Sequence, residues 1–117
     1  MFKEILKKTV DGLPGALGAI FADWEGESVE YQYAGPEDDI KLLGAHQGIL
    51  LGIINGVSGS YGMGEVRCVL VSAESAKLVV RPLKDGYYLV VMLGPYANGG
   101  LAIRAVEAAA AELMAGM

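Results

Sequence analysis

The chain has 117 residues, the size of one domain with a sizeable hydrophobic core and little length to spare for an elaborate active site. Hydrophobic residues make up 53% of it, which excludes an intrinsically disordered protein. Its net charge is −5, from 14 acidic and 9 basic residues without a basic run, which argues against nucleic acid and anionic membranes as partners.

The termini and the cysteine content bear on the compartment. Cys68 is the only cysteine, so the chain cannot form an internal disulfide. The N-terminal residues Phe2-Lys3-Glu4 lack the apolar core of a signal peptide. We therefore expect a cytoplasmic protein.

The first third of the chain predicts one helix and two strands. Apolar residues keep helical spacing from Phe2 until Gly12 and Pro14 end the helix. Strands are expected over residues 16–23 and 27–34, joined by a turn in which Gly26 is the last residue.

A long helix follows Gly35-Pro36 and runs to about Ser58 or Gly59. The acidic residues Glu37, Asp38 and Asp39 suit the positive end of its dipole. A glycine-rich connector leads out of it. The segment Gly56 to Gly64 superficially resembles a phosphate loop, but it follows a helix and precedes a strand, so we interpret it as a connector.

Three further strands and a closing helix complete the domain. The strands are expected near residues 65–72, 76–82 and 86–94, with Asp85-Gly86 as a hairpin signal. Asn98 is a plausible cap for a helix from Gly99 to Met114.

The pattern of each strand indicates its place in the sheet. Residues 87–93 and 16–22 are apolar on both faces, which is typical of central strands. The strand 27–34 alternates apolar and polar residues and suits an edge. The strand near residues 65–72 suits the opposite edge, where Val69 and Val71 leave an apolar face that another chain could complete.

The long helix carries glycines at strict four-residue spacing. Each costs about 1 kcal/mol relative to alanine in a helix interior, so a close approach must compensate for them. They are Gly44, Gly48, Gly52 and Gly56.

Two faces of this helix differ in character. Apolar residues, together with His46 and Gln47, fill an arc of roughly 200°, which is wider than one sheet needs. We expect that arc to pack on the domain and on a second copy of the chain, and the glycine side to face a partner. A membrane span is the alternative, but the apolar stretch is shorter than about 20 residues and is interrupted by polar ones.

Element order, length and two stretches resemble the Roadblock family of dynein light chains and its bacterial relatives. The stretches are Arg81-Pro82-Leu83-Lys84-Asp85-Gly86-Tyr87-Tyr88-Leu89-Val90-Val91 and Asn98-Gly99-Gly100-Leu101-Ala102-Ile103-Arg104. The resemblance implies an α+β fold of order α-β-β-α-β-β-β-α. Its antiparallel sheet would have the order 2-1-5-4-3, with the long helix on one face and the other two helices on the opposite face.

The resemblance also implies a homodimer, formed through the third strand and the long helix, that binds a small Ras-like GTPase. The dimer contacts would be His46, Ile49, Ile53, Glu65, Arg67, Val69 and Val71. The GTPase would dock on Lys41, Gly44, Ala45, Gly48, Gly52 and Asn55. Some relatives of this kind accelerate GTP hydrolysis.

No group of residues predicts catalysis by the chain alone, and we expect neither a cofactor nor a metal. His46 is the only histidine, so a histidine pair cannot bind metal; we interpret it as a core or dimer-interface residue, with a pH-sensitive role as the alternative. Cys68 is most simply a small hydrophobic residue, and redox sensing is its alternative.

The remaining candidates are three arginines and a tryptophan. Arg67, Arg81 and Arg104 could each be proposed as an arginine finger, but we expect two on strands and the third far from the glycine side. Trp24, at a hairpin tip, is either a partner anchor or a partly covered turn residue.

These observations predict a homodimeric Roadblock-type scaffold that regulates a small Ras-like GTPase. The alternatives are an adaptor subunit of a motor or signalling assembly, a small-ligand sensor domain and, last, an enzyme.

Overall fold

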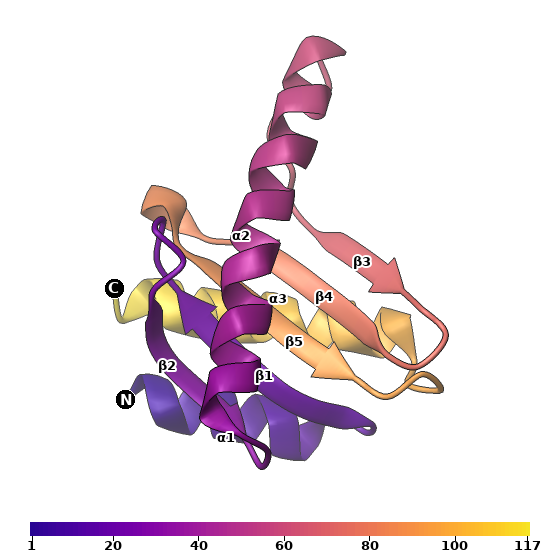
Figure 1. The fold of residues 1–117 in the computed structure, drawn as a ribbon. Coiled ribbons are helices and arrows are strands. Elements are labelled where there is room, and N and C mark those ends of the chain that lie inside the picture. Colours follow the sequence, from indigo (N-terminus) through magenta and orange to yellow (C-terminus); the bar gives the residue numbers. More distant parts are fainter.

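The computed structural model describes residues 1–117 as a five-stranded sheet between two layers of helix (Figure 1). In chain order the elements are α1 (Phe2–Gly12), β1 (Ala16–Ala22), β2 (Ser28–Tyr33), α2 (Glu37–Ser60), β3 (Val69–Ser72), β4 (Lys77–Pro82), the 3₁₀ turn η1 (Lys84–Gly86), β5 (Tyr88–Leu93) and α3 (Gly99–Ala115). The predicted α+β class and element order are confirmed.

The sheet has the order β2-β1-β5-β4-β3, and every neighbouring pair is antiparallel. This confirms the predicted order 2-1-5-4-3. The strands that are apolar on both faces, β1 and β5, lie inside the sheet, while the alternating β2 lies at an edge. β3 forms the other edge, as expected.

Two hydrophobic cores lie on opposite faces of this sheet. Successive residues of β5 alternate between them: Leu89 and Val91 face α1 and α3, whereas Tyr88 and Val90 face α2. β1 alternates in the same way, with Phe21 on the first face. A central strand must therefore be apolar at every position, which is the pattern that its sequence shows.

The predicted helix cap, hairpin turn and acidic helix start are all found at the expected residues. The Asn98 side chain accepts a hydrogen bond from the backbone N–H of Leu101 and caps α3. Asp85 and Gly86 both have positive φ, at 58° and 81°, as a tight hairpin turn between β4 and β5 requires. The acidic residues at 37–39 occupy the first turn of α2.

β3 is shorter than predicted, because it begins at Val69 and not near residue 65. Two side chains of α2 hold the preceding segment instead. Asn55 accepts the backbone N–H of Val66 at 3.1 Å, and Ser58 donates to the backbone oxygen of Gly64 at 2.6 Å. The prediction that Glu65 and Arg67 lie on the edge strand is wrong, since this segment is tied to the helix rather than to β4.

Candidate interaction surface

The first half of α2 packs on the sheet through its glycines. A Cβ added at Gly44 would lie 3.0 Å from two carbon atoms of Ile20, and one added at Gly48 would lie 2.6 Å from the hydroxyl of Tyr88. The Tyr88 hydroxyl donates a hydrogen bond of 2.9 Å to the backbone oxygen of Gly44. These two glycines allow the helix to sit directly on β1 and β5.

The prediction that Gly44 and Gly48 face a partner is therefore wrong. Gly44 is buried, and Ala45 is half-buried beside Gly26 of the β1–β2 turn. We expected the apolar arc to pack on the domain and on a second copy, and the glycine side to face a partner. The line that faces the sheet runs instead through Ile40, Gly44 and Leu51, so it includes part of the glycine side.

The second half of α2 is different, because it projects beyond the sheet (Figure 1). A Cβ added at Gly52 or Gly56 would meet no atom within 4 Å. Gly52 and Lys41 are exposed, as is Asn55, whose side chain is engaged with Val66. Of the predicted partner-binding set, Lys41, Gly52 and Asn55 thus lie on accessible surface.

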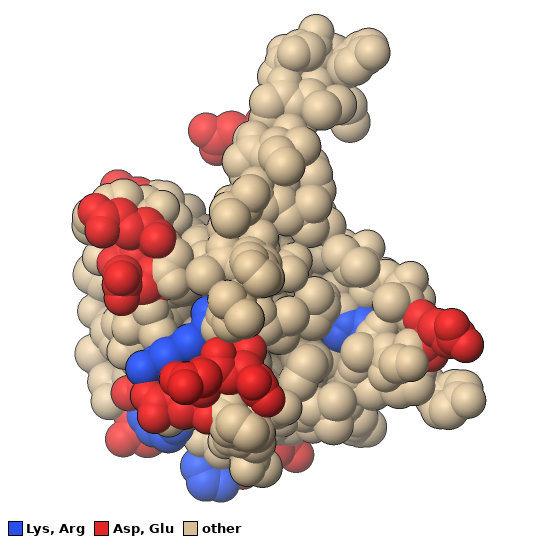
Figure 2. Space-filling view, in the orientation of Figure 1, with Lys and Arg blue, Asp and Glu red and all other residues tan.

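One line of apolar side chains along α2 has no cover in this chain. Ile49 and Ile53 are 65% and 61% exposed, and the line continues in both directions. We name it the α2 stripe: Leu42, His46, Ile49, Ile53 and Val57, all exposed. No charged residue occurs between Lys41 and Glu65. Figure 2 shows the projecting half of α2 accordingly as a column free of Lys and Arg.

An open groove separates the projecting half of α2 from the sheet edge. Ile54, Val57, Met63, Val66 and Leu70 contribute to its apolar lining. Val69 and Val71, on β3, are half-buried in the single chain. The α2 stripe adjoins this groove through Val57, and β3 adjoins it through Val69 and Leu70; charged residues such as Glu65, Arg67 and Arg81 also line the groove. The apolar residues of the stripe lie next to one another, unlike the scattered apolar residues of an ordinary monomer surface.

No family model and no curated protein matches the sequence, but solved structures match its architecture. A Roadblock/LC7 domain from Streptomyces avermitilis has a TM-score of 0.89 at 19% identity, with 97% of this chain and 95% of that chain covered. This chain has the Roadblock/LC7 fold. The predicted resemblance is confirmed at that level.

Two gliding proteins share the Roadblock/LC7 fold with this chain. MglB from Myxococcus xanthus matches with a TM-score of 0.87 at 15% identity, over 97% of this chain and 92% of that chain. MglB from Thermus thermophilus matches with a TM-score of 0.86 at 18% identity, over 97% of this chain and 86% of that chain.

Within this fold, two polar residues of α2 stand out. His46 is exposed on the α2 stripe. It is therefore not a core residue of the single chain, and its place in a dimer interface stays a prediction. The side-chain oxygen of Gln47 is buried and has no hydrogen-bond partner. The sequence places Gln47 within the apolar arc, and no neighbouring residue in the sequence indicates that its side-chain oxygen would lack a hydrogen-bond partner.

The candidate reactive residues occupy ordinary structural positions. Cys68 is half-buried, and burial, followed by the nearby carboxylate of Glu107, raises the pKa of its thiol. A raised pKa opposes formation of the reactive thiolate. Arg81 donates to Glu107 at 2.7 Å, and Arg67 lies on the segment before β3 rather than on a strand. No group of three or more His, Cys, Asp or Glu side chains could hold a metal ion.

Trp24 lies at the tip of the β1–β2 turn and is 63% exposed. Its ring makes an edge contact with the ring of Tyr87, with centroids 5.4 Å apart. The residue is thus a partly covered turn residue that still presents apolar surface.

α2 is also the one helix of the chain that is long and apolar enough to cross a membrane. That property follows from length and composition, and the first half of the helix is packed on the sheet.

Proposed function

We propose that this chain is a cytoplasmic, non-catalytic scaffold that forms a homodimer and regulates a small Ras-like GTPase. The observation that carries the proposal is the uncovered α2 stripe beside the open edge of β3, on a Roadblock/LC7 fold. Two copies that pair β3 with β3 and stripe with stripe would cover both surfaces at once. Such an interface is self-complementary, as a two-fold axis requires.

A second copy explains the exposed stripe better than a lipid bilayer does. A helix that spans a bilayer needs about 20 residues in contact with lipid. In α2 the residues from Ile40 to Leu51 include those that pack on β1 and β5, so only the projecting half is clear of the sheet. That half is too short to span a membrane.

With the stripe covered, the side of α2 that bears Lys41, Gly52 and Gly56 would stay open for another protein. A surface with few side chains lets a partner approach the helix closely. The resemblance to bacterial Roadblock proteins suggests a GTPase as this partner. Any acceleration of hydrolysis would then arise from a shift of the GTPase switch loops towards their active arrangement.

The dimer is tested by mass. At micromolar concentration, light scattering should give the mass of two chains, and Val69→Lys should weaken the dimer by placing a charge at the seam. Leu101→Lys changes an exposed apolar residue of α3 in the same way and serves as the matched control. A stable monomer in which the Val69 variant behaves like wild type would refute this interface.

The GTPase is tested with purified proteins. Co-purification from the native cell identifies candidates, and each is then loaded with GDP or a GTP analogue and titrated with the dimer. Gly52→Glu should weaken binding while the dimer mass is kept, and Gly52→Ala should not. Equal affinity for both nucleotide states would favour the adaptor alternative, and a bound metabolite would favour the sensor. The purified chain should neither bind nor hydrolyse GTP on its own.

A further inference from the structure

The two edges of the sheet differ in how their free backbone groups are occupied. β2 and β3 are both edge strands, and each pairs on one side only. The N–H and C=O groups on the other side of an edge strand form a template for another chain. Side chains occupy part of the template at β2 and leave the template at β3 free.

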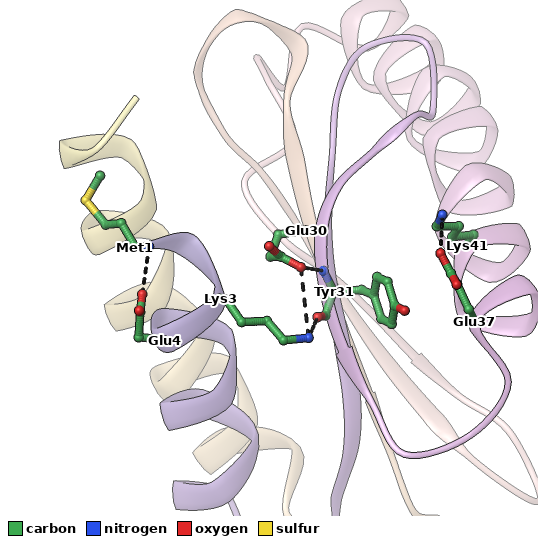
Figure 3. A network of polar contacts seen from close by, with 7 residues as sticks. All are labelled: Met1, Lys3, Glu4, Glu30, Tyr31, Glu37 and Lys41. Carbon is green, nitrogen blue, oxygen red and sulfur yellow. Dashed lines mark hydrogen bonds and ion pairs between the residues drawn. The ribbon is translucent and has the colours of Figure 1, made fainter.

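At the middle of β2, both backbone groups of Tyr31 are taken by side chains (Figure 3). The ammonium group of Lys3, from α1, donates a hydrogen bond to the Tyr31 backbone oxygen. The Glu30 carboxylate accepts the Tyr31 backbone N–H at 3.1 Å. These two side chains also pair with each other, with 3.9 Å between the Lys3 nitrogen and a Glu30 oxygen.

The Tyr31 ring brings the opposite layer of helix into the same arrangement. The Lys3 nitrogen lies 4.8 Å from the ring centroid, and the Lys41 nitrogen, from α2, lies 5.9 Å from it. Lys41 is in turn paired with Glu37 at 2.5 Å, and this pair lowers the pKa of the Glu37 carboxyl. Lysines from both layers of helix thus lie near the Tyr31 ring, but only Lys3 and Glu30 contact the free backbone groups of β2.

The edge of β3 has no such cover. No side chain forms a hydrogen bond with a backbone group of Val69–Ser72. The two edges therefore differ in one respect: charged side chains form hydrogen bonds with the backbone of β2 and none do so with the backbone of β3.

We propose that Lys3 and Glu30 form a clamp that closes the β2 edge to strand pairing and so restricts association between copies of this chain to β3. An incoming strand at β2 would have to displace both charged groups from their backbone partners and hold them beside its own backbone, at a desolvation cost. If both edges were open, β2 of one copy could pair with β3 of the next and build an open-ended chain. The clamp keeps the assembly closed. This inference rests on the proposed association through β3.

The test is a double variant, Lys3→Met with Glu30→Thr, which removes both clamp groups and leaves net charge unchanged. Light scattering over a range of concentrations should show species larger than those of the wild type, growing with concentration. The matched control is Lys8→Met with Glu112→Gln, which removes an ion pair of 2.6 Å between α1 and α3, away from the edge. This control should keep the wild-type mass.

Two outcomes would overturn the proposal that Lys3 and Glu30 act as a clamp. A double variant that melts at a lower temperature but keeps its wild-type mass would show that the contact only ties α1 to the sheet, and would overturn the proposal. If the control also forms larger species, the loss of an ion pair is enough to cause association, and the proposal is overturned. If the double variant does not fold, Lys3→Met alone frees the Tyr31 oxygen and is judged by the same masses.

Failure of the proposed dimer is a separate result. If the wild type is a monomer, association through β3 is refuted. A double variant that then associates through the opened β2 edge would still support the clamp, and one that stays monomeric would overturn it.

Discussion

The two halves of α2 carry the same glycine spacing and lie in opposite surroundings. Gly44 and Gly48 meet Ile20 and Tyr88 so closely that no Cβ fits without movement, whereas Gly52 has open space around it. The residue type and the four-residue interval are identical in both halves. What differs is whether the sheet lies opposite, since the helix continues beyond it (Figure 1).

A glycine ladder therefore has no single meaning along one helix. In the first half it permits close packing within the domain, and the Tyr88 hydroxyl fills the space that side chains would take. In the second half the missing side chains leave bare backbone beside the α2 stripe, where a partner could approach.

The largest expected effect is that of a bulky residue in the first half. Gly48→Leu places a side chain where the Tyr88 hydroxyl already lies 2.6 Å from the first added carbon. Overpacking of this kind costs about 1–3 kcal/mol or more in the free energy of unfolding. Thermal or urea denaturation measures it, with Gly52→Leu as the matched control that should melt at or above the wild-type temperature. Equal losses in both variants would remove the distinction between the two halves.

An intermediate effect is expected from Tyr88→Phe, which removes the hydrogen bond to the Gly44 backbone oxygen. A lost hydrogen bond of this kind costs about 0.5–1.5 kcal/mol. The variant should therefore melt below wild type at neutral pH, while Tyr96→Phe, at an exposed residue, should not.

The same pair of variants tests a dependence on alkaline pH. Burial, followed by the charge of Asp23, raises the pKa of Tyr88 above its ordinary value of 10.0. In the unfolded chain this phenol ionises first, so wild-type stability should be lost as the pH rises from about 10 through the folded-state pKa. Tyr88→Phe should lose less stability over this range than Tyr96→Phe does. An identical alkaline decline in the two variants would contradict this assignment.

The smallest effect is a gain. Gly52→Ala adds a methyl group that meets no atom within 4 Å, so it should stabilise the chain by about 0.4–1 kcal/mol through the unfolded state. In the first half, Gly44→Ala must move Ile20 by a few tenths of an ångström and should not give the same gain. Denaturation midpoints of the two alanine variants decide this, and a destabilised Gly52→Ala would mean that its side is already covered.

Strand positions were predictable because the sequence pattern of a strand reports on both of its faces. β5 is apolar at each position since its residues alternate between two cores, whereas in β2 only Tyr31 and Tyr33 pack against a core. The length of β3 was not predictable in this way. Its start at Val69 depends on Asn55 and Ser58 of α2, which hold residues 64–66 and are remote from β3 in the chain.

Sequence pattern was enough to specify the order of the elements, which strands are central and which are edges, and the existence of a helix more apolar than one sheet requires. These follow from periodicity and from residues such as Asn98 and Gly86, which act on their immediate neighbours. The full strand order came from the resemblance to the Roadblock family and not from the pattern. The rotation of α2 about its axis was set by tertiary packing, because an apolar arc of roughly 200° allows more than one side to face the sheet. Ile20 and Tyr88 selected the glycine side of the first half by filling the space beside it. The cover of the β2 edge also depends on tertiary packing, since Lys3 reaches Tyr31 only after α1 has packed beneath the sheet.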